Sequence, residues 1–221
     1  MHILAVGATQ GTGQLIAERL HARGDRLTII ARSPQKVTLP AETIRADLID
    51  PASLPADFSP YDALVLTAGV TKRPAGEALV KATEYDGTRH LLDAAAKGGF
   101  TGRLLYMNSI GVTHNTLMSA LLNLAKGRTM HWRQQTEAAI RAAGVPHTIL
   151  RAGLLNNRPA GTHTLRVVEE DIPLKLGTQV SRADMADLFV AALDTEASIN
   201  RCYSVIWEES GPRQDLRALL R

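Results

Sequence analysis

The sequence predicts an α/β fold in which a parallel β-sheet carries helices on both faces. Short apolar runs alternate with amphipathic stretches from the N-terminus to about residue 153. Such alternation builds βαβ units, and successive units form one parallel sheet. The first apolar run also passes through a glycine-rich turn directly into an amphipathic stretch. These features together predict a Rossmann-like, doubly wound parallel sheet, and the 221 residues fit a single domain spanning 1–221.

The expected strands of this region are apolar runs bounded by turn residues. They are HILAVG (2–7), RLTIIAR (26–32), ETIRAD (42–47), DALVLTAG (62–69), GRLLYMNS (102–109) and PHTILRAG (146–153). The expected helices lie between them and end on glycines, which commonly follow a helix C-terminus. They cover residues 11–24, 76–99 and 129–144.

Beyond Gly153 the periodicity is weaker, although a strand–helix–strand–helix order continues. We expect a short strand in THTLRVV, a helix over 181–194 capped by Ser181, a strand in RCYSVIW and a last helix over 212–221. The segments 112–131 and 153–178 follow the ends of predicted strands. Ligands of open α/β sheets bind at that edge, so these two segments are the predicted substrate side.

Composition excludes several classes of function. The 25 Lys and Arg residues are interleaved with 22 Asp and Glu residues, and aromatic residues make up 4%, so we expect no nucleic-acid partner. The single cysteine, Cys202, allows no internal disulfide, and no pair of histidines has metal-ligand spacing with a carboxylate, so we expect no metal. The N-terminus lacks the pattern of a signal peptide and no apolar run could span a membrane. A cytoplasmic protein, monomeric or homodimeric, is therefore expected.

The glycine-rich turn VGATQGTGQ predicts a site for a dinucleotide. Free N–H groups and the positive dipole end at a helix N-terminus suit a pyrophosphate, and glycines let the backbone come close to it. The alternative is a structural turn without a ligand. The predicted cofactor-binding residues of the turn are Gly7, Ala8, Thr9, Gln10, Gly11, Thr12 and Gly13.

Gln10 stands where such turns commonly place a second glycine, and Gly11 follows one residue late. Two arrangements would preserve binding. Either the turn shifts so that Gly11 makes the close approach, or Gln10 points away and its amide reaches a phosphate oxygen.

The tip of the second predicted strand favours NADP(H) over NAD(H). No Asp or Glu lies between Asp25 and Glu42, where an acidic residue would bind the ribose hydroxyls of NAD. Arg32 and Ser33 stand at that tip instead, with Lys36 a turn later, and an arginine there suits a 2′-phosphate. Arg32 as a solvated loop charge is the alternative. Asp47 and Leu48 end the third strand, where Asp47 either binds the adenine amino group or caps a helix.

Several stretches together resemble the atypical branch of the short-chain dehydrogenase/reductase superfamily, whose single-domain NAD(P)-binding members include flavin and biliverdin reductases. The similar stretches span nearly the whole chain. They are GATQGTG, EYDGTRHLLDAAAKGG, LLYMNSIGV, EAAIRAAGVPHTILRAGLL and SRADMADLFVAAL.

The resemblance implies further cofactor contacts. It places the loop of Thr67, Ala68 and Gly69 along the ribose and phosphates, and Ser109 near the nicotinamide, with Asn108 beside it. The stretch that it places along the nicotinamide amide comprises Arg151, Ala152, Gly153, Leu154 and Leu155. The family usually has proline at the position of Ala152, a mild departure if the contact is made by backbone.

The resemblance also shows what is missing. Family members that reduce carbonyls use a tyrosine with a lysine four residues later, and none of the four tyrosines here has that partner. Thr129 and Arg133 occupy the two positions, and arginine is a poor proton donor at neutral pH. Ser109, His131 and Arg133 are therefore the candidate catalytic residues, with His131 as a proton shuttle and His114 as a weaker candidate. Either histidine is alternatively a packing residue.

Hydride transfer to a flavin or quinone demands less, because such an acceptor delocalises the incoming charge and water supplies the proton. We therefore expect an NADPH-dependent oxidoreductase acting on a flat conjugated, small-molecule acceptor. The apolar stretch 117–124 is either one wall of the acceptor site or a lid helix packed on the core.

Two other functions compete with this reading. A non-catalytic NADP(H) sensor needs no dyad, whereas a nucleotide-sugar epimerase or dehydratase needs both the dyad and a larger C-terminal lobe. No G-x-S-x-G turn of a hydrolase occurs.

Overall fold

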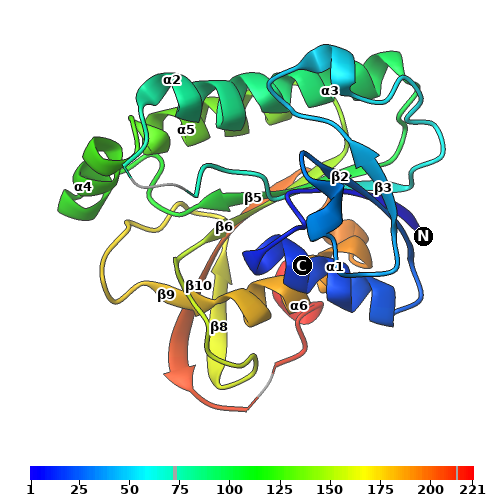
Figure 1. Ribbon diagram of the computed structural model, residues 1–221. Coiled ribbons are helices and arrows are strands. Elements are labelled where there is room, and N and C mark those ends of the chain that lie inside the picture. The colour runs from blue at the N-terminus through cyan, green and yellow to red at the C-terminus, as the bar shows by residue number, and fades with distance from the viewer. Residues whose placement is uncertain (72–73, 213) are drawn as a thin grey trace.

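The computed structural model describes residues 1–71, 74–212 and 214–221. Its centre is an eight-stranded sheet in the order β3-β2-β1-β4-β5-β6-β10-β8 (Figure 1). Neighbouring strands run parallel except for β8, which pairs antiparallel with β10 at one edge. The strands are β1 (His2–Val6), β2 (Arg26–Ala31), β3 (Glu42–Arg45), β4 (Ala63–Leu66), β5 (Arg103–Ser109), β6 (His147–Ala152), β8 (His163–Val168) and β10 (Arg201–Ser210). The predicted Rossmann-like sheet is confirmed, and the antiparallel edge strand is the departure from it.

Helices cover both faces of the sheet (Figure 1). One face carries α1 (Gly11–Ala22) and α6 (Arg182–Leu193); the other carries α3 (Gly87–Lys97) and α5 (Thr129–Ala142). Strand side chains alternate between the two faces of the sheet, so a central strand contributes side chains to the core on each face. In β1, Ile3 belongs to the core beneath α1 and α6, whereas Leu4 belongs to the core beneath α3 and α5.

The predicted long helix over 76–99 is interrupted. It comprises α2 (Glu77–Val80), a π-helical segment (Lys81–Asp86) and α3. The wider π-turn turns Glu84 inward, where its carboxylate accepts a hydrogen bond from the backbone N–H of Val70 at 3.0 Å. Such π-segments concentrate at functional sites, and a helical sequence pattern does not reveal them.

The predicted last helix over 212–221 is wrong. The described part of that stretch, which excludes Arg213, contains only a single 3₁₀ turn at Ala218–Leu220. Tertiary contacts replace the helix: the side chain of Gln214 accepts from the Leu165 N–H at 2.6 Å, and the Tyr203 hydroxyl donates to the Leu220 carbonyl at 3.0 Å. The tail is thereby fixed along β8 and β10.

The remaining elements lie around the carboxyl edge of the sheet or on connections. α4 (Leu117–Ala125) follows β5, and the short strands β7 (Leu154–Asn156) and β9 (Gln179–Ser181) form a separate parallel pair. Single 3₁₀ turns occur at Pro34–Lys36, Pro51–Ser53 and Glu196–Ser198. Ser181 caps α6 as predicted, because its hydroxyl accepts from the Asp184 N–H at 2.9 Å.

Candidate dinucleotide site

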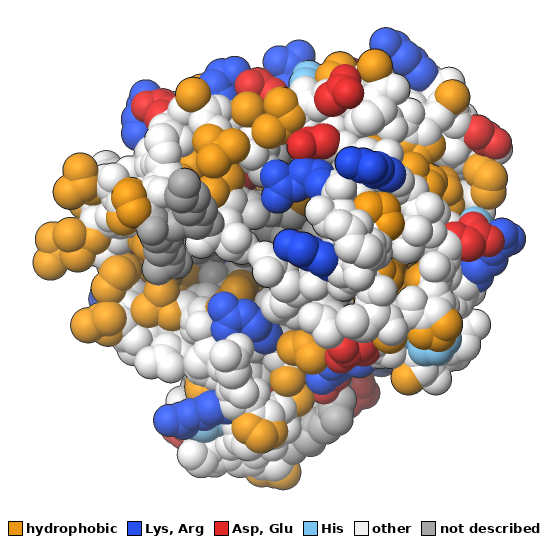
Figure 2. Space-filling model, in the orientation of Figure 1, with side chains coloured by type: hydrophobic (Ala, Val, Ile, Leu, Met, Phe, Trp, Pro, Cys, Tyr) orange, Lys and Arg blue, Asp and Glu red, His pale blue; other side chains and the backbone are white. Residues whose placement is uncertain are grey.

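A cavity of about 760 Å³ opens at the carboxyl edge of the sheet, beside the start of α1. Figure 2 shows a hollow at the centre of this face with Lys and Arg side chains around it. The predicted cofactor-binding residues that line the cavity are Gly7, Thr9, Gln10, Gly11, Thr12, Gly13, Arg32, Ser33, Lys36, Asp47, Leu48, Thr67, Ala68 and Gly69. The glycine turn, the tip of β2, the end of the third strand and the loop after β4 are therefore brought to one site.

Two glycines of the turn are required by close packing of backbone. A Cβ on Gly7 would lie 2.5 Å from the amide nitrogen of Ala68, and Gly7 also has a φ of +91°. A Cβ on Gly13 would collide with the carbonyl oxygen of Gly7 and the hydroxyl of Thr67. Neither neighbour can move away cheaply, so α1 approaches β1 and β4 only because both positions are glycine.

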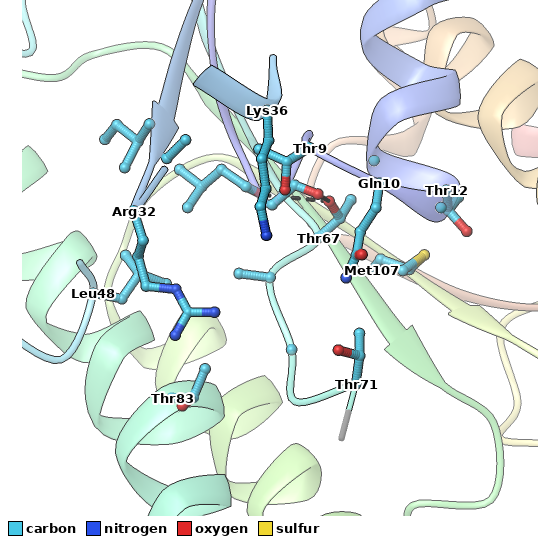
Figure 3. A pocket seen from close by; sticks show the side chains of 18 of the residues that line it. Thr9, Gln10, Thr12, Arg32, Lys36, Leu48, Thr67, Thr71, Thr83 and Met107 are labelled. Atoms are coloured by element: carbon cyan, nitrogen blue, oxygen red, sulfur yellow. Dashed lines mark hydrogen bonds between the residues drawn. The ribbon is translucent and has the colours of Figure 1, made fainter. Parts of the chain in front are cut away.

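The question about Gln10 is answered by the backbone. Gly11 has the left-handed φ of +60°, whereas Gln10 is extended, with φ −164° and ψ 165°. The special conformation has thus moved to Gly11, as the first of the two arrangements requires. The Gln10 side chain does not point away: it lines the cavity and extends into it in Figure 3.

The first turn of α1 offers further groups to an anion. It contains no acidic residue, and Gln10 makes no capping hydrogen bond to it. The hydroxyl of Thr12 is buried and has no hydrogen-bond partner. An orphaned buried hydroxyl is costly, and a ligand at this helix N-terminus would satisfy it.

Cationic side chains enter the cavity from the tip of β2. Arg32 and Lys36 both extend into it in Figure 3. On the neighbouring loop the Asp47 carboxylate accepts from the backbone N–H of Ile49 at 3.1 Å. Asp47 therefore stabilises its own turn while also lining the cavity.

The Thr67–Gly69 loop is fixed to the glycine turn. The Thr67 hydroxyl donates to the carbonyl of Gly7 at 3.2 Å (Figure 3). Gly69, at the other end of this loop, lies beside a buried ionic cluster: a Cβ there would be 3.3 Å from both Arg133 Nη2 and Glu84 Oε1.

Glu84 is the centre of that cluster. Its carboxylate lies 3.1 Å from Arg133 Nε, accepts from the Thr129 hydroxyl at 3.1 Å, and lies 3.9 Å from Lys126 Nζ. Burial lowers the pKa of Arg133, but the Glu84 carboxylate outweighs burial and the net pKa is raised. Both residues at the dyad positions, Thr129 and Arg133, are thus engaged by one carboxylate, and Arg133 stays protonated at neutral pH.

None of the three candidate catalytic residues, Ser109, His131 and Arg133, is among the residues that line the cavity. The Ser109 hydroxyl donates to the carbonyl of Ile110 at 3.1 Å, and the His131 ring packs edge-on against Trp132 at 4.9 Å between centroids. No hydrogen bond or ion pair of the described residues joins Ser109, His131 and Arg133. Their catalytic roles remain predictions.

A second buried ionic group involves two predicted cofactor-binding residues. Arg151 Nη2 lies 2.5 Å from Glu137 Oε1, and the Asn108 amide donates to Glu137 Oε2 at 3.0 Å. Both side chains are directed at Glu137, and they are not part of the cavity lining, nor are Ala8, Gly153 and Leu154. Contacts from these positions to a cofactor remain predictions, and for Arg151 a backbone contact is the one compatible with its buried ion pair.

The two predicted substrate-side segments are tied together by Asp171. Its carboxylate accepts from the backbone N–H of Gly111 at 2.6 Å and of Thr113 at 2.8 Å. His114, the weaker proton-shuttle candidate, is hydrogen-bonded to the Asp171 carbonyl at 2.8 Å. The loop after β5 is thereby fixed to the segment 153–178.

The stretch 117–124 forms α4, and its role as a wall of the acceptor site stays a prediction. Met118 and Leu122 pack on a small core, whereas Leu117 and Leu124 are 79% and 85% exposed. Figure 2 shows apolar side chains gathered on the projecting end of the molecule where α4 lies in Figure 1. α4 thus covers the core with one side only.

Sequence reasoning missed several residues that line the cavity, among them Thr71, Thr83, Met107, Asn157 and Arg182. Arg182 is the first residue of α6, and Asn157 follows β7 within the segment 153–178 that is the predicted substrate side. The sequence of the SRADMADLFVAAL stretch, which contains Arg182, predicts a capped helix and a family resemblance but no ligand contact.

Comparison with known proteins decides the family. A family model described as NAD(P)H-binding matches residues 7–196. The chain belongs to the NAD(P)H-binding family. Sanguinarine reductase of Eschscholzia californica, a reductase, is 26% identical over 240 residues, covering 92% of this chain and 88% of the relative.

Solved structures of other proteins share the fold. ChuY of Escherichia coli O157:H7, described as an anaerobillin reductase, has a TM-score of 0.75 at 18% identity, covering 96% of this chain and 100% of ChuY. A short-chain dehydrogenase/reductase of Veillonella parvula, solved with NADP, has a TM-score of 0.72 at 14% identity, covering 92% and 93% of the two chains.

The site of this NAD(P)H-binding protein fits its cofactor on the evidence of its own residues. Glycines that hold the turn close to the Thr67–Gly69 loop, an orphaned hydroxyl in the first turn of α1, and cations at the tip of β2 all suit a phosphorylated dinucleotide. No helix in the described part of the chain is long and apolar enough to cross a membrane.

Proposed function

We propose that this member of the NAD(P)H-binding family is an NADPH-dependent oxidoreductase that reduces a flat conjugated acceptor, such as a flavin or a quinone. The observation that carries the proposal is the pairing of Thr129 and Arg133 with Glu84. It leaves no protein acid at the position from which carbonyl-reducing relatives deliver a proton, while the dinucleotide cavity is intact.

NADPH is favoured over NADH by charge at the tip of β2. Arg32 and Lys36 extend into the cavity (Figure 3). A 2′-phosphate would form charge-assisted hydrogen bonds with such cations, and a ribose hydroxyl would not.

The chemistry of the acceptor follows from what the protein can supply. Bound NADPH supplies a hydride, and the residues of this chain bind and orient the two reactants. A flat acceptor spreads the incoming charge over its rings and takes its proton from water, so no titrating side chain is needed. The reductase relatives support reduction as the direction of the reaction.

A non-catalytic NADP(H) sensor is favoured by the same pairing of Thr129 and Arg133 and is the second candidate. Turnover separates the two. Purified protein is incubated with NADPH or NADH and with FMN, riboflavin or a simple quinone, and cofactor oxidation is followed by absorbance. The reductase predicts turnover that is faster with NADPH; tight NADPH binding without oxidation by any acceptor supports the sensor.

A further inference from the structure

We propose that Arg182 is an additional cofactor-binding residue, which holds the pyrophosphate from the side opposite the glycine turn. The proposal rests on the dinucleotide assignment made above. It adds a cationic residue from the C-terminal part of the chain, more than 160 residues away from the turn in sequence.

The position of Arg182 beside the start of α1 supports the proposal. Arg182 lines the same cavity as the glycine turn, and its Nε lies 3.8 Å from the place where a Cβ of Gly11 would be. Gly11 is the first residue of α1, so the guanidinium lies over the helix N-terminus at which an anion is expected.

This position is fixed by packing. α1 and α6 lie side by side (Figure 1), and their buried side chains belong to one core that includes Ile16 and Met185. Arg19 of α1 also forms an ion pair with Asp187 of α6. Because Arg182 is the first residue of α6, this contact places its side chain at the start of α1.

The charge of the Arg182 guanidinium also supports the proposal. Among the residues that the structure describes, Arg182 forms no ion pair. Its hydrogen bonds use Nη1 alone, which donates to Asn157 Oδ1 at 2.8 Å and to the carbonyl of Leu155 at 3.4 Å. Both acceptors are neutral, so the positive charge is uncompensated, and the donors on Nε and Nη2 remain for a ligand.

The same cavity contains a second polar group that could bind a phosphate. Thr12 is only 4% exposed, and its hydroxyl has no hydrogen-bond partner. A phosphate group at the N-terminus of α1 would accept from backbone N–H groups, from this hydroxyl and from Arg182, which accounts for both features with one ligand.

The arrangement also gives the guanidinium a second role. Leu155 and Asn157 begin the segment 153–178, and both line the cavity. Arg182 therefore connects the phosphate-binding end of the cavity with the start of the predicted substrate side.

The test is the dissociation constant of NADPH, NADH and 2′-phospho-ADP-ribose, measured calorimetrically for wild type, Arg182→Gln and Arg182→Lys. A pyrophosphate contact predicts that Arg182→Gln weakens all three ligands by a similar factor, about 10- to 100-fold. Arg182→Lys keeps the charge and loses the planar fork, so a smaller loss of about three- to tenfold is expected. Arg166→Gln removes the same charge from an exposed position on β8 and should leave all three constants unchanged.

The outcomes distinguish the possible failures. Wild-type affinity for Arg182→Gln overturns the proposal and leaves the dinucleotide site intact. A loss for NADPH but not NADH assigns Arg182 to the 2′-phosphate, and a loss confined to ligands with nicotinamide assigns it to the other end; each result also overturns the proposal. Wild-type protein that binds none of the ligands refutes the cofactor assignment itself. Thermal unfolding of each variant confirms that the protein measured is folded.

Discussion

Arg133 lies against Glu84 in the interior, with 3.1 Å between Nε and Oε2 and with only 1% of the Glu84 side chain exposed. The same carboxylate binds the Thr129 hydroxyl and the Val70 N–H. One π-turn thus determines the surroundings of both positions at which carbonyl-reducing relatives carry tyrosine and lysine. Glu84 explains how an arginine is accommodated there and why it is held rather than free to move.

Replacing Glu84 should therefore destabilise the fold. Glu84→Gln leaves Arg133, whose side chain is only 19% exposed, without its carboxylate, and breaking a buried pair costs about 3–5 kcal/mol, so a loss toward the lower end of that range is expected. The free energy of unfolding from urea titration measures the loss. The matched control is Glu42→Gln, which removes the exposed partner of Arg26 and should leave the unfolding midpoint unchanged. Equal midpoints for both variants would contradict the role given to Glu84.

The second buried pair predicts a pH dependence of stability. Burial raises the pKa of Glu137, but the hydrogen bond and charge of Arg151 outweigh burial and the net pKa is lowered from its ordinary value of 4.5. A group whose pKa is depressed by folding stabilises the protein above its ordinary pKa, and this contribution is lost as pH falls through the folded-state pKa.

Glu137→Gln should therefore cost about 3–5 kcal/mol at pH 7, because it leaves Arg151 buried without a carboxylate. The difference from wild type should shrink once pH falls below 4.5 and approaches the lowered folded-state pKa, where the wild-type carboxylate itself becomes protonated. Urea titrations at several pH values give the comparison. A difference that stays constant across this range would show that the charge of Glu137 is not what stabilises the fold.

The 2′-phosphate assignment predicts selective loss of one cofactor. Arg32→Ala should weaken NADPH by about 10- to 100-fold and NADH by less than about threefold, because only NADPH carries the phosphate that Arg32 would bind. Calorimetric titration of both cofactors is the measurement, with Arg166→Ala as a control for the loss of one exposed charge. Equal losses for NADPH and NADH would remove Arg32 from the 2′-phosphate site.

Substitutions at the adjacent positions 10 and 11 of the glycine turn should differ in their effects on stability and on NADPH affinity. Gly11→Ala places a side chain at φ +60° and should cost about 1–2 kcal/mol of stability, although its Cβ would meet only Arg182 Nε, at an ordinary contact distance of 3.8 Å. Gln10 has an extended backbone that any residue adopts, so Gln10→Gly should bind NADPH no more tightly than wild type. Thermal unfolding and calorimetry measure the two effects. Clearly tighter binding by Gln10→Gly would show that the side chain obstructs the cofactor.

The regular part of the fold was predictable because each strand and helix carries its own periodicity. β1, β2, β4, β5 and β6 are apolar runs bounded by turn residues, and their alternation with helices determines a parallel sheet. The last helix was mispredicted for a tertiary reason, since Gln214 and Leu220 bind side chains and backbone of β8 and β10. A local pattern holds no information about such contacts.

The residues of the site likewise fall into those whose place could be predicted from sequence and those whose place could not. The glycine turn and Arg32 follow a strand directly, so their place at the sheet edge could be inferred from sequence. The inward turn of Glu84 depends on a π-helical segment, and the approach of Arg182 to Gly11 depends on the packing of α6 against α1. Both require the three-dimensional structure, because neither is encoded in residue spacing.

The proposed function is hydride transfer from NADPH to a flat conjugated acceptor. It is tested most directly by the oxidation of NADPH and of NADPH deuterated at the transferred position, with FMN or a quinone as acceptor. Hydride transfer from NADPH predicts turnover, a primary isotope effect with one of the two stereospecifically labelled cofactors, and deuterium loss from that cofactor. Tight binding of NADPH with no oxidation above the protein-free rate by any flavin or quinone would contradict it.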